Sequence, residues 1–286
     1  CTSNGFKNGY KRSFYYISSS AIATNMNKME REYAFEQRTY IADLPAPEEI
    51  GKLAAERALK MTGATKPLTG KYPIIFNERI SSSIISHILN AINGQSITRG
   101  SSWLLNYLDN KIIPENLNII EDPYIPRLSG SRPFDAEGLV SKKNIFVENG
   151  ILKKWVLDLK TSKQLGLKST SNAFRTGSGY PYPSVGNIEL VGGDLTLDEL
   201  LEKANEGLMV CSMIGSTINQ NSGDYSRGAA GFWFKNGKIS HPINECTIAG
   251  NLKQMIQNMT IATDIKPHLS RRVPSILIND MTVAGN

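Results

Sequence analysis

The stretch that decides the fold is residues 223–251, GDYSRGAAGFWFKNGKISHPINECTIAGN. Its glycines allow positive φ angles or a close approach of backbone, which other residues adopt only at a cost. An aromatic run at residues 232–234 is followed by Asn236 and Gly237, the strongest short signal for a β-hairpin. We therefore expect a glycine-lined turn that leads into a hairpin, with a new element launched after Gly250 and Asn251.

The same stretch supplies four candidate binding residues, Gly223, Asp224, Arg227 and Gly228. In a structural interpretation, Asp224 caps backbone amides of a tight turn and Arg227 is paired locally. In a functional interpretation, the segment is a wall of a peptide channel, where an extended peptide adds a strand to an exposed sheet edge. Both interpretations stay open, and Arg227 is the residue that we expect to act in function.

Outside this stretch, periodicity predicts a β-rich chain with several helices. Short apolar runs predict strands, an Asn149-Gly150 pair predicts a hairpin, and a capping box at Thr196 and Glu199 predicts a helix that stops at Gly207. Further helices are expected after Pro47 and along an isoleucine-rich stripe. We expect an α+β fold with mixed or antiparallel sheets, in which the strands lie near residues 10–23, 32–41, 72–76, 117–120, 208–214 and 275–283.

Composition excludes several classes of protein. The 286 residues can bury a large core, and their 40% hydrophobic and 20% charged content is ordinary for a globular protein. The net charge of +6 is spread without a basic run, so nucleic-acid binding is not implied.

No apolar stretch approaches the roughly 20 residues of a membrane helix, and no secretory signal is visible. Three cysteines, Cys1, Cys211 and Cys246, fit buried thiols in a reducing cytoplasm better than a disulfide framework.

Four blocks of sequence carry a resemblance to a known family. They are RGSS at 99–102, PFDAEG at 133–138, LGLKSTSNA at 165–173 and GDYSRGAAGFW at 223–233. In this order they resemble the PmbA (TldE) branch of the TldD/PmbA family, once named modulator of DNA gyrase and now regarded as a peptidase system. The resemblance implies a TldD/PmbA C-terminal domain over residues 46–286 and a remnant of the central or N-terminal region at residues 1–45. Because the chain starts at Cys1 without an initiator Met, we expect a fragment.

The metal chemistry of the family is not expected in this chain. The TldD branch resembles a zinc peptidase with a His-Glu-x-x-x-His helix and a thiolate near the C-terminus. The resemblance places that signature on residues 85–90, where Ile85 and Asn90 take the histidine positions and Ser86 takes the glutamate position. His87 falls between them and would point away on a helix. No cysteine follows Cys246, so we expect no catalytic residue and no zinc here.

Other catalytic sets are incomplete. Ser226 lies beside charged residues, but no histidine or G-x-S-x-G elbow accompanies it. Asp135 and Glu137 would share a face of a strand as a carboxylate pair, although a solvated loop pair is the commoner outcome. His241 and His268 have no metal-ligand spacing.

The resemblance implies a non-catalytic subunit of a cytoplasmic TldD/PmbA metalloprotease complex. A TldD-like partner would supply zinc and the general base, and this chain would help enclose unfolded or leader peptides, as in peptide maturation. Arg99 either anchors a partner loop or lies solvated after its helix. Two alternatives stay open, a self-sufficient hydrolase and a regulatory protein that binds DNA gyrase, and a homodimer in isolation is a further expectation.

Overall fold

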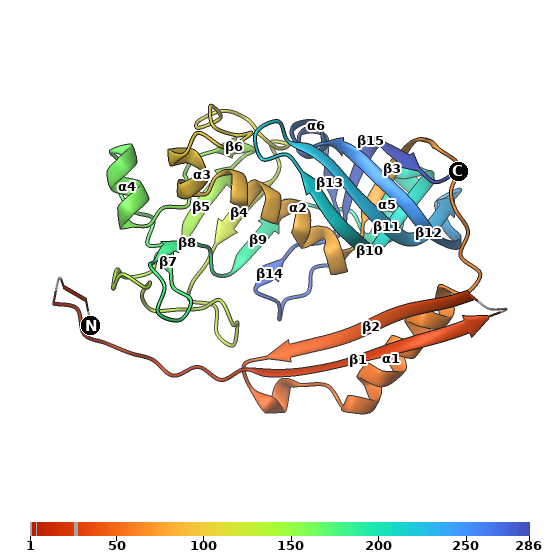
Figure 1. Ribbon diagram of the computed structural model, residues 1–286, viewed down its shortest axis with the longest axis horizontal. Coiled ribbons are helices and arrows are strands. Elements are labelled where there is room, and N and C mark those ends of the chain that lie inside the picture. The colour runs from red at the N-terminus through yellow and green to blue at the C-terminus, as the bar shows by residue number, and fades with distance from the viewer. Residues whose placement is uncertain (1, 4, 26–27) are drawn as a thin grey trace.

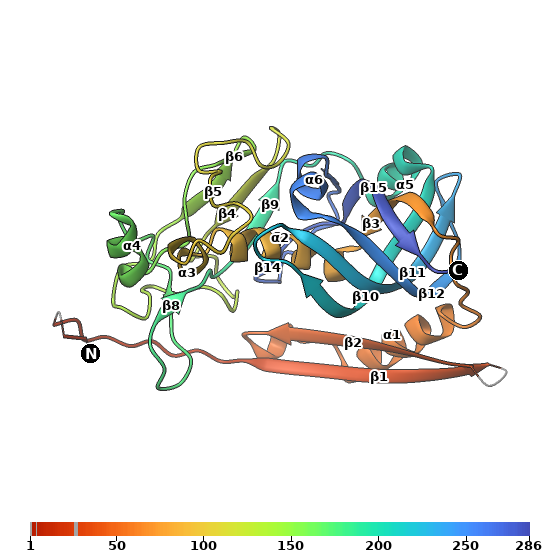
Figure 2. The same cartoon turned by 45° about the horizontal axis from the view of Figure 1, so that its top comes forward.

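The computed structural model describes residues 2–3, 5–25 and 28–286, so Cys1 lies outside the described residues. Figures 1 and 2 show a two-stranded ribbon and one helix along one side of a larger body. The ribbon pairs β1 (Tyr15–Asn25) with β2 (Lys28–Arg38) in antiparallel register. None of the helices in the described ranges combines the length and apolarity needed to cross a bilayer.

Helix α1 (Pro47–Lys60) covers one face of this ribbon. Pro47 begins the helix, acidic residues occupy its first turn, and Arg57 and Lys60 lie in its last turn, an arrangement that suits the helix dipole. Small side chains let the helix approach the strands closely, and the contact is made by Ile17, Ala21, Ala34, Ile50 and Ala54. A short 3-10 helix, η1 (Ile41–Asp43), connects β2 to α1.

The body contains a closed ring of five strands. In order around the ring these are β12 (Lys238–Asn251), β11 (Asp224–Lys235), β10 (Glu206–Ile218), β3 (Gly70–Phe76) and β15 (Ile276–Ala284). The ring closes where Thr247, Ile248 and Ala249 of β12 pair with the end of β15. Only β3 and β10 run parallel within the ring, and β13 (Thr260–Ile261) adds to β15.

A second sheet lies beside the ring, with strand order β14 (Arg271–Arg272), β9 (Ile188–Val191), β4 (Asn118–Glu121), β5 (Asn144–Glu148) and β6 (Ile151–Leu152). Asn149 and Gly150 join β5 to β6 with φ angles of 47° and 76°, which is the hairpin geometry expected of an Asn-Gly pair. A separate pair, β7 (Ala173–Phe174) and β8 (Tyr182–Pro183), and two short helices, α3 (Gly94–Thr98) and α4 (Leu159–Leu165), complete this half.

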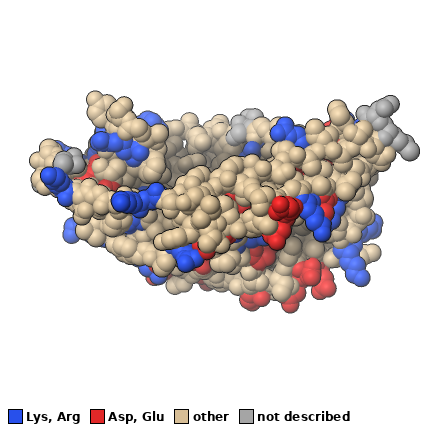
Figure 3. All heavy atoms as spheres, turned by 90° about the horizontal axis from the view of Figure 1, so that it is seen from below, with Lys and Arg blue, Asp and Glu red and all other residues tan. Residues whose placement is uncertain are grey.

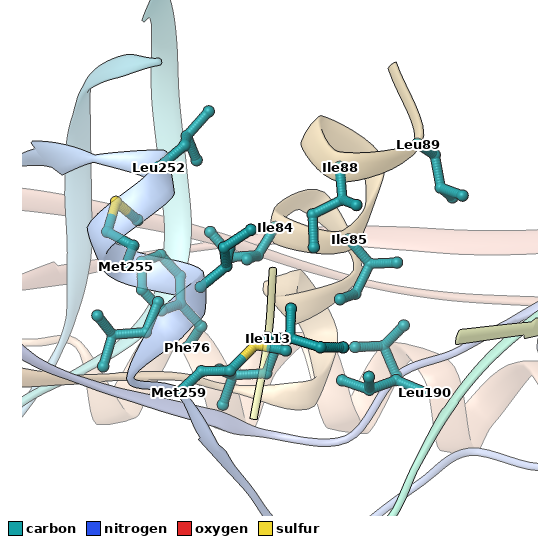
Figure 4. Close-up of a cluster of buried hydrophobic side chains, with 14 of the residues drawn as sticks. Phe76, Ile84, Ile85, Ile88, Leu89, Ile113, Leu190, Leu252, Met255 and Met259 are labelled. Atoms are coloured by element: carbon teal, nitrogen blue, oxygen red, sulfur yellow. The ribbon is translucent and has the colours of Figure 1, made fainter. Parts of the chain in front are cut away.

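Helix α2 (Glu78–Ala91) lies at the centre of the main core. Figure 4 shows Ile84 of α2 near Phe76 and Met255, which lie on β3 and α6 (Leu252–Gln257). Strand β3 alternates: Ile74 and Phe76 join this core, whereas Ile75 packs with Leu200 and Leu201 of α5 (Leu197–Ala204). Each fully buried isoleucine contributes about 1.5–3 kcal/mol, so the stripe on α2 holds the two sheets together.

The α+β fold class is confirmed, with mixed sheets and several helices. The capping box at Thr196 and Glu199 forms as predicted, and Asn236 and Gly237 make the expected turn with φ angles of 53° and 70°. The helix after the capping box ends at Ala204, however, and not at Gly207. Gly207 lies in β10, where a Cβ atom would meet the Pro73 carbonyl oxygen at 2.2 Å.

The expectation of a glycine-lined turn at residues 223–231 is wrong beyond Gly223. Gly223 has a φ of 83°, but Asp224 begins a continuous strand that is paired on both sides. Position 231 requires glycine because the two strands pack closely there. A Cβ atom at this position would lie 2.0 Å from the Met209 carbonyl oxygen of β10.

The N-terminal strands also differ from the expected ranges. The first strand begins at Tyr15 and the second ends at Arg38. Thr39 and Ile41 therefore do not continue the strand face of Tyr33 and Phe35. Thr39 is buried instead and donates to the Arg127 carbonyl oxygen.

Replacement of Gly231 by alanine tests the close packing of β10 and β11. Gly231→Ala should lower the free energy of unfolding by about 1–3 kcal/mol, because the strands must separate to admit the methyl group. Gly228→Ala on the same strand is the matched control, since its Cβ atom would lie 3.3 Å from the Ile214 carbonyl oxygen. Urea unfolding measures both; equal effects of the two variants would contradict this account.

Candidate functional site

The face of α2 opposite its isoleucine stripe carries small polar side chains. Ser82, Ser86 and Asn90 follow one another at four-residue spacing, so they share one face of the helix. The Ser86 hydroxyl donates to the Ser82 carbonyl oxygen at 2.8 Å, and Asn90 is exposed. Ile85 is fully buried in the core. The helix register is therefore fixed by packing, with its polar side turned outward.

A cavity of about 510 Å³ lies on this polar side. Its walls come from α2, from α3 and the residues after it, from the β8 region, from Gln220 and from Arg271. Most lining groups are neutral amides and hydroxyls, which can both donate and accept hydrogen bonds. The polar lining residues include Ser86, Asn90, Asn93, Gln95, Arg99 and Gln220.

Asn93 positions one wall of this cavity. Its side-chain oxygen accepts from the Gln95 amide at 3.0 Å and so caps α3, while its Nδ2 donates to the Pro183 carbonyl oxygen at 2.8 Å. The side chain thereby ties α3 to β8. The cavity wall is built from segments 90 residues apart in sequence.

The RGSS block places Arg99 at the rim. Arg99 is exposed and caps the C-terminus of α3, and Gly100 takes a φ of 66° immediately after it. Ser102 is buried and donates to the Ala91 carbonyl oxygen at 2.6 Å. Ser101 donates to Asn221 Oδ1 at 3.1 Å, which joins this block to the segment before β11.

The structure brings Arg99 to the cavity but leaves the other four candidates off its lining. The exposed Asp224 carboxylate accepts from the Ser222 hydroxyl at 2.6 Å and from Asn251 Nδ2 at 3.1 Å, and these bonds lower its pKa. Arg227 instead donates to the Gly215 carbonyl oxygen at 2.8 Å. Gly223 immediately precedes β11, and Gly228 lies within the strand.

Strand addition at residues 223–231 is not available, because β10 and β12 flank β11 on both sides. The exposed sheet edge that this hypothesis needs is therefore missing at β11 in the part of the chain that the structure describes. A role of Gly223, Asp224, Arg227 and Gly228 in binding stays a prediction, and it would have to use side chains or the turn before the strand.

His87 faces β11 and not the cavity. Its ring makes an edge contact with Tyr225, with centroids 5.8 Å apart, and it is not among the residues that line the cavity. Burial and, to a smaller extent, the charge of Arg227 lower the pKa of His87 to about 4. The imidazole is therefore neutral at neutral pH.

The donor set present does not fit a zinc site of the family type. At the aligned positions Ile85 offers a buried hydrocarbon, and Ser86 and Asn90 offer neutral oxygen and amide groups, whereas zinc sites use imidazole, thiolate and carboxylate. Among the described residues, no three His, Cys, Asp or Glu side chains gather in a metal-binding arrangement. Cys211 and Cys246 are buried as expected, and burial raises their pKa to about 12 and about 11, which disfavours thiolate.

Asn172 of the 165–173 block belongs to a buried hydrogen-bond network around Glu121. Asn172 Nδ2 lies 3.0 and 2.8 Å from the two Glu121 carboxylate oxygens, and Asn144 Nδ2 lies 3.1 Å from one of them. Arg132 is a longer ion-pair partner of Glu121 at 3.5 Å. The carboxylate is 1% exposed, so these donors replace its water.

Asp135 and Glu137 are neither a strand pair nor a solvated loop pair. Asp135 is buried and accepts from the backbone amides of Glu137, Leu139 and Ala173. Glu137 accepts from the Leu159 amide at 2.8 Å, and burial raises the pKa of Glu137. Asp135 thus fixes the 133–138 block against the 165–173 block.

Sequence reasoning missed most of the cavity. Ser86 and Asn90 carried a usable signal, the polar stripe at four-residue spacing on the helix. Gln220, Tyr182 and Arg271 carried none, because they are brought to α2 by chain segments far away in sequence.

Comparison with known proteins gives consistent matches. A family model described as the PmbA/TldA metallopeptidase C-terminal domain matches residues 69–285, and one described as the central domain matches residues 1–62. "Metalloprotease PmbA" of Escherichia coli O157:H7 is 36% identical over 284 residues, which are 99% of this chain and 61% of that protein. The chain thus spans about three fifths of that relative.

Two solved structures share the fold. A Bacteroides thetaiotaomicron protein described as a modulator of DNA gyrase has a TM-score of 0.90 at 28% identity, over 99% of this chain and 63% of that chain. TldE from Thermococcus kodakarensis has a TM-score of 0.83 at 21% identity, over 95% of this chain and 63% of its own.

The buried imidazole makes stability depend on pH. Because the folded pKa of His87, about 4, lies below its ordinary value of 6.5, the unfolded chain takes up the proton first as pH falls. The free energy of unfolding should therefore decrease between pH 6.5 and pH 4, and less steeply in His87→Gln. An NMR titration midpoint of His87 near 6.5 would refute the assignment.

The Glu121 network should be essential for folding stability. Asn172→Leu removes both amide contacts and leaves a buried carboxylate short of donors, so we expect a loss of about 3 kcal/mol. Asn106→Leu changes an exposed asparagine and should stay within about 0.5 kcal/mol of the parent. Thermal and urea unfolding give both values, and a mild effect of Asn172→Leu would show that the carboxylate is solvated or protonated.

Proposed function

Because the chain belongs to the PmbA/TldA metallopeptidase family, we propose that it acts as the PmbA-type, non-catalytic subunit of a two-component peptidase. In this proposal a TldD-like partner supplies the zinc ion and the general base. This chain forms one wall of the compartment in which an unfolded or leader peptide is held.

One observation carries the proposal: Ile85, Ser86 and Asn90, at the positions where the resemblance places the metal signature, are not side chains of the types that bind zinc. Ile85 is fully buried among core residues, and its replacement by a ligand would require the helix to rotate against the stripe that holds both sheets. Ser86 cannot act as the general base at a neutral pH in the way that a carboxylate does. The family assignment and these residue types together support a role in which the chemistry lies on another chain.

The cavity beside α2 suits an extended peptide of varied sequence. Asn90, Asn93 and Gln95 present amide groups, which match the amide and carbonyl groups of a peptide main chain. Recognition of the main chain does not require an apolar pocket that selects one type of side chain. Selectivity would then come from enclosure, because only a flexible chain can enter a compartment formed by two subunits.

The face of the molecule seen from below gives no support for a role on DNA. Figure 3 shows basic side chains that are dispersed over the face seen from below and interspersed with acidic ones. Proteins that bind duplex DNA without sequence specificity depend on many phosphate contacts from a continuous basic surface. A regulatory action on gyrase itself would have to use protein contacts.

Reconstitution with a TldD-like protein of the same organism tests the proposal. The chain alone should leave a fluorogenic unstructured peptide uncut and should bind less than stoichiometric zinc by elemental analysis. The mixture should cleave the peptide, and a chelator should abolish the cleavage. Light scattering of the mixture should detect a complex larger than either protein.

Two results would overturn the proposed role as a non-catalytic subunit. Turnover by the purified chain alone, sensitive to a chelator, would make it a self-sufficient hydrolase. A stoichiometric zinc ion lost on Asn90→Ala would place a metal site on α2, contrary to the proposal.

A further inference from the structure

A second cleft lies between the ribbon and the body, outside the cavity beside α2. It has a volume of about 310 Å³. The end of β2, α1, the first turns of α2 and the segment before β14 form its walls. Tyr33, Phe35 and Leu269 give it an apolar side.

The lining of the cleft is also strongly basic. Six arginine and lysine side chains line it, against two glutamates, Glu36 and Glu78. The basic residues are Arg38, Arg57, Arg79, Arg127, Lys266 and Arg271. Because the cleft is partly shielded from water, this excess of positive charge favours an anion within it.

Four of the six basic side chains already have a carboxylate partner. Arg79 contacts Glu32 at 2.9 Å, Lys266 contacts Glu78 at 3.5 Å, and Arg127 contacts Asp43 at 2.6 Å. Arg38 pairs with Glu36, whose other neighbour is His268. These carboxylates neutralise the charge of the four side chains.

Arg57 and Arg271 differ from the other four. Arg57 donates to the Tyr33 carbonyl oxygen at 3.0 Å, and Arg271 donates to the Gly186 carbonyl oxygen. Within the described ranges, no carboxylate lies within ion-pair distance of either guanidinium. Burial lowers the pKa of both guanidinium groups; the charge of Arg79 lowers that of Arg57 further, while Glu32 and Glu78 oppose the shift of Arg57 and Glu121 opposes that of Arg271. Two partly buried cations thus line one cleft. Each guanidinium has five N–H donors, more than its backbone carbonyl acceptor can use.

Arg271 also connects the cleft to the cavity described above. It lines both of them, and it lines a third cavity bounded by Tyr10, Arg132 and Phe174. Ser129 and Ser270 are shared by the cleft and this third cavity. A chain that leaves the cavity beside α2 along these walls therefore reaches Arg271 and the basic cleft.

We propose that this cleft binds a carboxylate of the peptide substrate, held by the guanidinium group of Arg57. The proposal rests on the peptide-enclosing role proposed above and specifies the chemistry of one end of the peptide. Arginine suits this task because its planar fork donates two parallel hydrogen bonds to a carboxylate. The aromatic rings of Tyr33 and Phe35 would contact the side chain that precedes the carboxylate.

Peptide binding to this chain alone tests the proposal. The probe is an eight-residue unstructured peptide with a fluorophore at its N-terminus, and anisotropy gives its Kd. One arm compares the free C-terminal acid with the C-terminal amide, and a second compares an internal Asp with Asn. We expect one of these neutral analogues to bind about tenfold more weakly or worse, since a hydrogen bond to a charged group is worth about 1.5–3 kcal/mol.

Variants locate the effect in the cleft. Arg57→Gln should weaken binding of the acid peptide about tenfold and abolish the difference between acid and neutral peptides. Arg57→Lys keeps the positive charge but loses the planar guanidinium. Its Kd for the acid peptide should lie between those of the parent protein and of Arg57→Gln. Arg31→Gln is the matched control, because Arg31 is exposed on β2 and does not line the cleft. Circular dichroism confirms that each variant is folded, and the comparison of peptides in the parent protein needs no variant.

The outcomes separate this inference from the proposed function. Equal Kd values for acid and neutral peptides, or an Arg57→Gln variant that keeps the preference, would overturn the carboxylate site even if the partner complex cleaves peptides. Tighter binding of a single-stranded oligonucleotide, lost in Arg57→Gln, would likewise overturn it in favour of nucleic acid. A failed reconstitution with intact carboxylate preference would contradict only the two-component peptidase.

Discussion

The burial of the isoleucine stripe of α2 is the constraint on which the structure depends. Ile84, Ile85 and Ile88 are fully buried and belong to one cluster with residues of both the strand ring and the second sheet. Because one helix serves as common core for two sheets, its rotation about its own axis is fixed. Every other property of the helix follows from this register, including which residues line the neighbouring cavity.

The same constraint explains why Ile85 cannot serve as a metal ligand. Residues one turn apart share a face, so a position committed to the core cannot also present a ligand to the cavity. Ile85 is such a position, whereas Ser86 and Asn90 lie at the polar side. What remains at its surface is a set of neutral hydrogen-bonding groups beside Arg99.

Local features were predictable from sequence, and long-range ones were not. Hydrophobic periodicity located β3 and α2, the capping box located α5, and Asn-Gly pairs located two hairpin turns, because each signal acts within a few residues. The role of Gly231 was not predictable, because a glycine in the sequence can mark either a turn or a close approach of two strands. Here it allows β10 and β11 to approach closely. The basic cleft was equally hidden. Its walls combine residues 33–39 with residues 266–271, and no local pattern marks such a meeting.

The closed ring of strands has a consequence for how this chain acquires its structure. The seam between β12 and β15 joins residues 247–249 to residues 282–284, while β3 on the other flank of β15 comes from residues 70–76. Closure therefore waits for strands separated by about 200 positions, and such non-local pairing slows folding. Until the last strand docks, β3 and β12 expose unpaired backbone. During that interval the nascent protein is vulnerable to aggregation, and a chaperone that shields strand edges would raise its yield.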